Sequence, residues 1–137
     1  MKLVKTFNVP AEFFYQKMIH SILFDIRKST GETIKEHRLK GFSYVKQFSS
    51  NAKGKITIDE IVSNETYAYT TSTVRNEFKV SYQIRAISAS ECEVTYSEEV
   101  VSYGFLQKAN DLLFGIFLVP FKKKQLIKML SAIEASY

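Results

Sequence analysis

The chain has 137 residues and a formal net charge of +5, and 14% of its residues are aromatic, with eleven Phe, eight Tyr and no Trp. This length predicts a single domain over residues 1–137 with a core of its own. The lone Cys92 excludes an internal disulfide, and residues 1–10 lack the apolar run of about 7 to 15 residues that a signal peptide needs, so we expect a cytoplasmic protein.

The first elements expected along the chain are a short strand and a helix. Residues 2–7 are consistent with the strand. Pro10 suits the start of the helix, with Asn8 or Val9 just before it, and Glu12 falls in the first turn, where the helix dipole favours a carboxylate. Apolar residues at helical spacing predict that the helix runs to about Arg27 and that Gly31 ends it.

From Lys35 to Ser102 the apolar period changes to two, with turn residues about every ten positions. This pattern predicts a meander of five strands near residues 36–48, 55–62, 66–75, 78–87 and 92–102. With the N-terminal strand, the sheet has at least six strands. For the first strand of the meander, the pattern does not decide which face points inward, and Gly41 is a candidate for a β-bulge.

Alternation within these strands predicts which side chains face inward. The second strand of the meander directs Ile56, Ile58 and Val62 inward and carries Glu60 with them. The fifth does the same with Glu98, between Tyr96 and Val100. In the third, we choose as inward the face whose members are Tyr67, Tyr69, Thr71, Thr73 and Arg75.

The segment after Ser102 predicts a long C-terminal helix, apolar along one stripe. Residues Leu112 to Phe121 are apolar on every side of the helix. They must therefore be covered on more than one side by the rest of the protein, or face a partner or a lipid surface. They are too few to cross a bilayer, which takes about 20 residues. Gly115 and Pro120 predict a kink or break between Gly115 and Phe121.

These elements together predict an α+β helix-grip fold, in which a curled antiparallel sheet of six or seven strands wraps around the C-terminal helix. Their order, with NVPAEFF at the first strand-to-helix turn, resembles the START-like (SRPBCC) superfamily, which includes birch-pollen-allergen-like and polyketide-cyclase-like domains. Four segments are also similar to a family of small proteins of Gram-positive bacteria catalogued as a domain of unknown function: Ser21–Gly31, Leu39–Phe48, Thr71–Ile84 and Gln107–Lys124.

The resemblance implies a pocket between the sheet and the last helix that takes a hydrophobic or amphipathic small molecule. It implies no catalytic residues and no cofactor. The residues that we expect to line the pocket share an inward register or a place on the last helix: Tyr44, Ile58, Glu60, Tyr67, Tyr69, Arg75, Tyr82, Tyr96, Glu98, Leu112 and Ile116.

Glu60 and Glu98 are the most informative of these residues, because an unpaired buried carboxylate costs several kcal/mol. They are either pocket acids or ordinary strand-end carboxylates that are solvated or paired with Arg75 or a lysine, and the second reading is favoured. The tyrosines suit a pocket wall and a plain core equally well.

Other chemistries lack a motif. His20 and His37 have no metal-ligand spacing, no glycine-rich phosphate loop is present, and Cys92 has the surroundings of a small buried hydrophobe. The lysines are not interleaved with exposed aromatics, which argues against nucleic-acid binding.

Three functions remain open. Non-catalytic binding of an apolar or amphipathic small molecule leads. A cyclase- or hydrolase-type enzyme using Glu98 or Glu60 is the first alternative, and a homodimeric interaction module that pairs through Leu112 to Phe121 is the second. Contact of this segment with a membrane surface ranks below both a pocket lid and a dimer interface.

Overall fold

The computed structural model of the chain describes residues 1–50, 52–102 and 123–137. Strand β1 (Lys2–Phe7) leads into helix α1 (Ala11–Thr30), and a 3-10 turn, η1 (Glu36–Arg38), precedes the meander. The meander consists of β2 (Ser43–Ser49), β3 (Ala52–Val62), β4 (Thr66–Ser72), β5 (Asn76–Ala86) and β6 (Cys92–Ser102). Residues 123–135 form the C-terminal helix.

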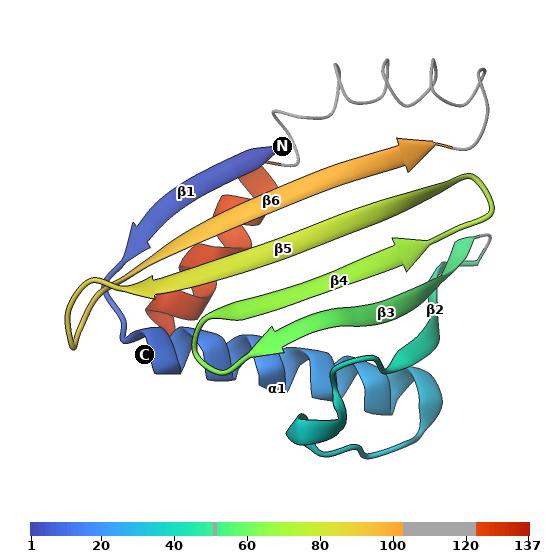
Figure 1. Cartoon of the computed structure of the whole chain (residues 1–137), viewed down its shortest axis with the longest axis horizontal. Coiled ribbons are helices and arrows are strands. Elements are labelled where there is room, and N and C mark those ends of the chain that lie inside the picture. The colour runs from blue at the N-terminus through green and yellow to red at the C-terminus, as the bar shows by residue number, and fades with distance from the viewer. Residues whose placement is uncertain (51, 103–122) are drawn as a thin grey trace.

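All six strands form one antiparallel sheet in the order β1-β6-β5-β4-β3-β2. The sheet is twisted, and α1 and the C-terminal helix lie on the same side of it (Figure 1). This is the helix-grip arrangement that the sequence predicts. The first half of the expected last helix, with its predicted break between Gly115 and Phe121, lies outside the described residues.

Helix α1 forms as its sequence predicts, with its apolar stripe buried against the sheet. The N-cap is Pro10 rather than Asn8, whose backbone N–H donates instead to Glu134 Oε2 on the C-terminal helix at 2.7 Å. Gly31 ends the helix in the left-handed conformation (φ 78°), and its N–H donates to the carbonyl oxygen of Arg27. A residue with a side chain would be strained at this φ.

The strand expected at residues 36–48 begins later than predicted. A 3-10 turn and a left-handed Gly41 (φ 83°) occupy its first part, and the strand itself starts at Ser43. The Gly41 N–H donates to the carbonyl oxygen of Ile58, and the Ile58 N–H donates to that of Phe42. The chain therefore joins β3 through a turn before it becomes a regular strand.

A β-bulge at Asp59 corrects the predicted faces of β3. Ile58 pairs with Tyr69, but the next pair is Glu60 with Ala68, so Asp59 is an extra residue. After Asp59, the residues that face inward are shifted by one position. Ile61, opposite Tyr67, therefore faces inward, and Glu60 and Val62 face outward. The inward register predicted for Glu60 and Val62 is therefore wrong.

The concave face of the sheet has cross-strand rows of inward side chains. One row runs through Ile61, Tyr67, Tyr82, Tyr96 and Leu3, which are directly opposite one another on neighbouring strands. A second runs from Ile58 through Tyr69 and Val80 to Glu98. The tyrosine face chosen for β4 and the inward register of Glu98 are thus both correct.

Candidate functional site

Two neighbouring cavities lie between the concave face of the sheet and the C-terminal helix. The first, which we call the α1 cavity, has a volume of about 390 Å³. Helix α1 lines it with Met18, Ser21, Ile22 and Asp25, and the C-terminal helix lines it with Met129, Leu130 and Ile133. Its remaining wall comes from inward residues of β2 to β5, among them four tyrosines: Tyr44, Tyr67, Tyr69 and Tyr82.

The second, which we call the β6 cavity, has a volume of about 500 Å³. It lies toward β6, where Tyr96 and Glu98 line it, and Leu126 of the C-terminal helix contributes to its wall. Phe48, Tyr69 and Thr71 line both cavities. These three side chains therefore form the boundary between the two spaces.

Gly54 makes room for the Phe48 ring at this boundary. A Cβ atom at Gly54 would lie 3.0 Å from Phe48 Cε2, 3.1 Å from the carbonyl oxygen of Ser72 and 3.3 Å from Thr71 Cγ2. Such distances are tighter than ordinary van der Waals contact, and the Ser72 oxygen belongs to the backbone of the next strand. The missing side chain is thus what lets Phe48 pack over β3.

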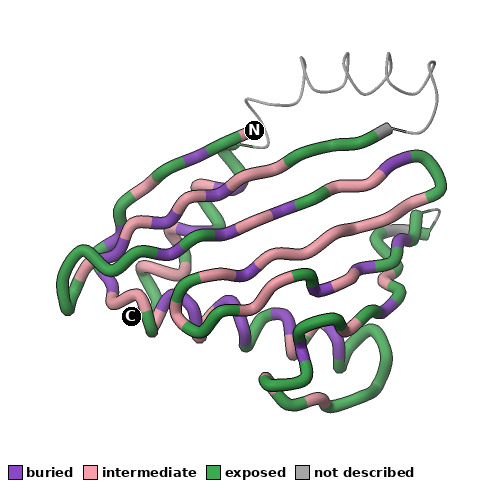
Figure 2. Tube along the Cα trace, viewed as in Figure 1, coloured by how far each residue is buried: buried purple, intermediate pink, exposed green. Residues whose placement is uncertain are grey.

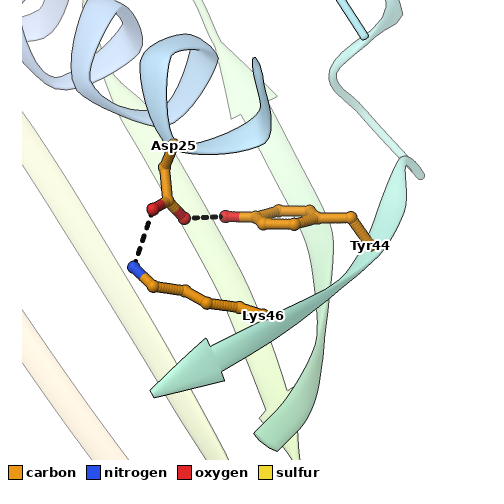
Figure 3. A network of polar contacts seen from close by, with 3 residues as sticks. All are labelled: Asp25, Tyr44 and Lys46. Carbon is orange, nitrogen blue, oxygen red and sulfur yellow. Dashed lines mark hydrogen bonds and ion pairs between the residues drawn. The ribbon is translucent and has the colours of Figure 1, made fainter. Parts of the chain in front are cut away.

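A polar network of three residues stands at the wall of the α1 cavity (Figure 3). The Tyr44 hydroxyl donates to Asp25 Oδ2 at 2.5 Å, and Lys46 Nζ lies 2.8 Å from Asp25 Oδ1. Each carboxylate oxygen of Asp25 therefore has one donor, and the charge of Lys46 offsets that of Asp25. Lys46 also lies over the Phe48 ring, with its Nζ 5.8 Å from the ring centroid.

Sequence reasoning missed Asp25 and Lys46, although a signal for each was present. Asp25 lies three residues after Ile22 and seven after Met18, which places it on the buried stripe of the helix. Lys46 lies two residues from both Tyr44 and Phe48, on the same face of β2. The two residues have opposite charges, so each meets the requirement that a half-buried charge be paired.

A second polar pair belongs to the β6 cavity. The Tyr96 hydroxyl donates to Glu98 Oε2 at 2.7 Å. Burial raises the pKa of Tyr96, and the hydrogen bond to Glu98 raises it further. Burial likewise raises the pKa of Tyr44, with the Asp25 hydrogen bond adding to the rise. Both phenols are therefore neutral donors at physiological pH.

Tyr69 is influenced by the charges of both Glu98 and Asp25. Burial raises its pKa to about 12, and the charges of Glu98 and then Asp25 contribute to the rise. Burial also raises the pKa of Tyr67 and of Tyr82. The tyrosine wall is therefore protonated over the whole physiological pH range.

The other residues predicted to line the pocket are placed differently. Ile58 is fully buried in the core. Glu60 is paired with Lys40 at 3.2 Å on the outer face, with 44% of its side chain exposed, because of the bulge at Asp59. Arg75 lies in the turn between β4 and β5, since β4 ends at Ser72. Leu112 and Ile116 lie outside the described residues.

Cys92 is fully buried, and burial followed by the nearby charge of Glu134 raises the pKa of its thiol. A protonated, inaccessible thiol is a poor nucleophile. Among residues 1–50, 52–102 and 123–137, no group of three His, Cys, Asp or Glu side chains is arranged to hold a metal ion. In the same part of the chain, no helix is both long and apolar enough to cross a membrane.

A family model described as "Domain of unknown function (DUF3284)" matches residues 1–119. The chain belongs to this family. This match confirms the similarity to a family catalogued as a domain of unknown function. No curated protein matches the chain.

Solved structures with the same fold are distant in sequence. Ara h 8.0201 superposes with a TM-score of 0.63 at 14% identity, covering 99% of this chain and 95% of its own. Norcoclaurine synthase from Thalictrum flavum, in complex with dopamine and hydroxybenzaldehyde, has a TM-score of 0.63 at 10% identity, covering 98% of this chain and 83% of its own. These likenesses confirm the START-like helix-grip fold.

A third structure, DynU16, a putative protein of the dynemicin biosynthetic locus, matches with a TM-score of 0.52 at 12% identity. The match covers 76% of this chain but only 37% of DynU16. At such identities, the three structures establish the fold alone.

Proposed function

We propose that the protein binds a hydrophobic or amphipathic small molecule in the α1 cavity, without catalysing a reaction. The observation that carries this proposal is the cavity itself, of about 390 Å³, lined by methyl groups and rings around one charge-balanced polar network. Pockets for small molecules are typically about 300 to 1,000 Å³ in volume, mostly apolar, with a few polar groups that fix orientation.

Norcoclaurine synthase supports this proposal by analogy, because it is a protein of the same fold that was solved in complex with dopamine and hydroxybenzaldehyde. Fold analogy is a weak argument for function. The lining of the α1 cavity is the stronger one. Its apolar side chains supply affinity. The tyrosine hydroxyls, the Asp25 carboxylate and the Lys46 ammonium group supply orientation.

The test is a titration of the purified protein with N-phenyl-1-naphthylamine, an uncharged probe whose fluorescence rises in apolar surroundings. We expect saturable binding to one site. Ile133→Trp, which fills the cavity from the C-terminal helix, is expected to weaken binding at least tenfold. Ala132→Trp is the matched control, because Ala132 is the exposed neighbour of Ile133 on the same helix.

Two results would overturn the proposal. One is the absence of saturable binding to the unmodified protein. The other is equal binding by Ile133→Trp and Ala132→Trp, which would place the probe outside the cavity. Circular dichroism of both variants checks that each retains the native fold.

A second function, acid-base catalysis of the cyclase or hydrolase type, is favoured by one observation. Glu98 lines the β6 cavity beside the Tyr96 hydroxyl, so a carboxylate and a phenol meet at the same wall. Glu60 plays no part in it, because it faces outward. If such an activity exists, Glu98→Gln is expected to abolish turnover while leaving probe binding intact, and unchanged turnover would contradict this role.

The dimer reading depends on Leu112 to Phe121, which lie outside the described residues. It stays a prediction of the sequence. Sedimentation of the full chain at high concentration tests it directly, with a monomer as the contradicting result.

A further inference from the structure

One aromatic side chain, Phe48, lies at the boundary between the α1 cavity and the β6 cavity. It lines both spaces, together with Tyr69 and Thr71. Tyr69 and Thr71 belong to β4, inside the sheet, whereas Phe48 belongs to β2, the strand at the edge of the sheet. The Phe48 ring therefore extends over β3 toward β4, and it crosses the concave face where the two cavities meet.

A β-bulge in β2 carries this ring. Gln47 pairs with Lys53 and Ser49 pairs with Ala52, so Phe48 is an extra residue in the ladder between β2 and β3. A bulge bends its strand and redirects a side chain, and bulges are frequent at sheet edges and beside functional sites. The position of Phe48 thus depends on a departure from regular pairing at the edge of the sheet.

The strand beneath the ring leaves room for it. A Cβ atom at Gly54 would lie 3.0 Å from Phe48 Cε2 and 3.3 Å from Thr71 Cγ2, so the ring edge and the Thr71 methyl group approach each other above the glycine. Lys46 Nζ lies 5.8 Å from the centroid of the Phe48 ring, within reach of a cation-π interaction. The bulge, the glycine and the lysine together hold the ring at the boundary.

The Phe48 side chain is not part of the closely packed core. The residue is 49% exposed, whereas the neighbouring inward residues Tyr44 and Ile56 are 5% and 6% exposed. A ring with so much free surface has few packing contacts to lose. Its removal is therefore expected to join the two spaces rather than to collapse the sheet onto the helices.

The sizes of the two cavities show what such a partition does. The α1 cavity has about 390 Å³ and the β6 cavity about 500 Å³, so each is large enough for a small molecule by itself. A ligand that outgrows the α1 cavity in the direction of β6 meets the Phe48 ring. The same ligand would find a second, mostly apolar space if the ring were absent.

We propose that Phe48 determines the length of the ligand, because its ring separates the α1 cavity from the β6 cavity. The unmodified protein accepts compact apolar or amphipathic molecules in the α1 cavity and rejects the extra length of longer ones. This inference rests on the proposed function, because it names the residue that sets the specificity of that same cavity.

The test uses a series of uncharged straight-chain alcohols from 1-hexanol to 1-dodecanol, whose dissociation constants are measured by displacement of N-phenyl-1-naphthylamine. Each methylene group that becomes buried strengthens binding about fourfold. For the unmodified protein we expect this increase to stop at an intermediate length, where the chain fills the α1 cavity. Further methylene groups should then add less than about twofold each.

Phe48→Ala is expected to move this limit to longer chains, so that 1-dodecanol binds at least tenfold more tightly than it does to the unmodified protein while 1-hexanol binds equally well. Phe48→Leu, which keeps an apolar side chain without the ring, should give a smaller shift in the same direction. It also keeps the test decisive if Phe48→Ala loses the native circular dichroism spectrum. Phe24→Ala is the matched control, because Phe24 is 69% exposed on α1 and is not among the residues that line either cavity.

The outcomes distinguish this inference from the proposed function. If neither N-phenyl-1-naphthylamine nor any alcohol binds, ligand binding in the α1 cavity is itself wrong. If the alcohols bind but the unmodified protein and both Phe48 variants give the same dependence on chain length, the cavity binds ligands and Phe48 does not select them. A steady fourfold increase up to 1-dodecanol in the unmodified protein, or binding of the naphthylamine without displacement by any alcohol, would also overturn the role of Phe48.

Discussion

Asp25 shows how one residue can be both part of a helix stripe and part of a site. It lies where an apolar residue would complete the buried face of α1, yet its two oxygens are matched by Tyr44 and Lys46 (Figure 3). Its helical position could be read from the sequence by spacing alone. Its partners could not, because nothing local joins residue 25 to β2.

Asp25→Ala is expected to lower the free energy of unfolding by about 1 to 2 kcal/mol, because it strips a partner from both Tyr44 and Lys46. Urea denaturation measures this change. Asp59→Ala is the matched control: Asp59 is exposed and accepts one hydrogen bond, from Thr70, so it should cost less than about 0.5 kcal/mol. Equal losses in the two variants would contradict a structural role for the network.

Tyr69 gives the fold a dependence on alkaline pH. Its pKa is about 12 in the folded protein, whereas an unfolded tyrosine ionises near pH 10. The unfolded chain therefore loses this proton first. The stability from protonated Tyr69 is complete below about pH 10 and is lost as the pH rises toward about 12.

Urea unfolding at several pH values across this range tests the dependence. Tyr69→Phe is expected to lose less stability with rising pH than the unmodified protein, and the exposed Tyr137→Phe is expected to match the unmodified protein. Parallel curves for Tyr69→Phe and the unmodified protein would show that Tyr69 does not titrate with a raised pKa.

At the scale of elements, alternation predicted most of the concave face and failed where the backbone departs from a regular strand. The inward registers of β4, β5 and β6 follow directly from their sequences. The bulge at Asp59 and the turn at Gly41 do not, because each depends on hydrogen bonds to a distant segment. Glu60 was assigned to the pocket for this reason.

Strand β3 also depends on the small size of Gly54. Gly54→Ala is expected to lower the free energy of unfolding by about 1 to 3 kcal/mol, because the added Cβ crowds Phe48 and the Ser72 carbonyl oxygen. Thermal or urea denaturation measures the loss.

Combining Gly54→Ala with Phe48→Ala shows how much of this loss comes from crowding of the Phe48 ring. The double variant should recover only part of the loss, since the contact with the backbone of β4 remains. Full tolerance of Gly54→Ala in the presence of Phe48 would show that the strands move apart easily at this point.

At the scale of the whole molecule, the C-terminal helix closes the cavities and is tied to the start of the chain. Two of its own side chains, Leu126 and Leu130, are buried. Glu134 accepts from the Asn8 N–H at 2.7 Å, and Lys5 Nζ lies 3.2 Å from Ser131 Oγ. The order of elements predicted this closure, whereas the cavity volumes depend on side-chain packing that no sequence pattern encodes.

Glu134→Ala is expected to loosen this closure without unfolding the sheet. Hydrogen exchange should become several-fold faster in residues 123–135 and stay unchanged in β4 and β5, because local opening requires only the contacts of the helix to be lost. Glu12→Ala, an exposed carboxylate in the first turn of α1, is the control. Uniformly faster exchange throughout the chain would indicate global destabilisation instead.

The extra residue at Asp59 constrains how β3 can change. Its inward positions are Gly54, Ile56, Ile58 and Ile61, so the last interval is three residues instead of two. Loss of one residue here would restore strict alternation, turn Glu60 toward the tyrosines and expel Ile61. A relative that lacks this residue therefore needs an apolar side chain at the position of Glu60, and any alignment across this strand has to place its gap at Asp59.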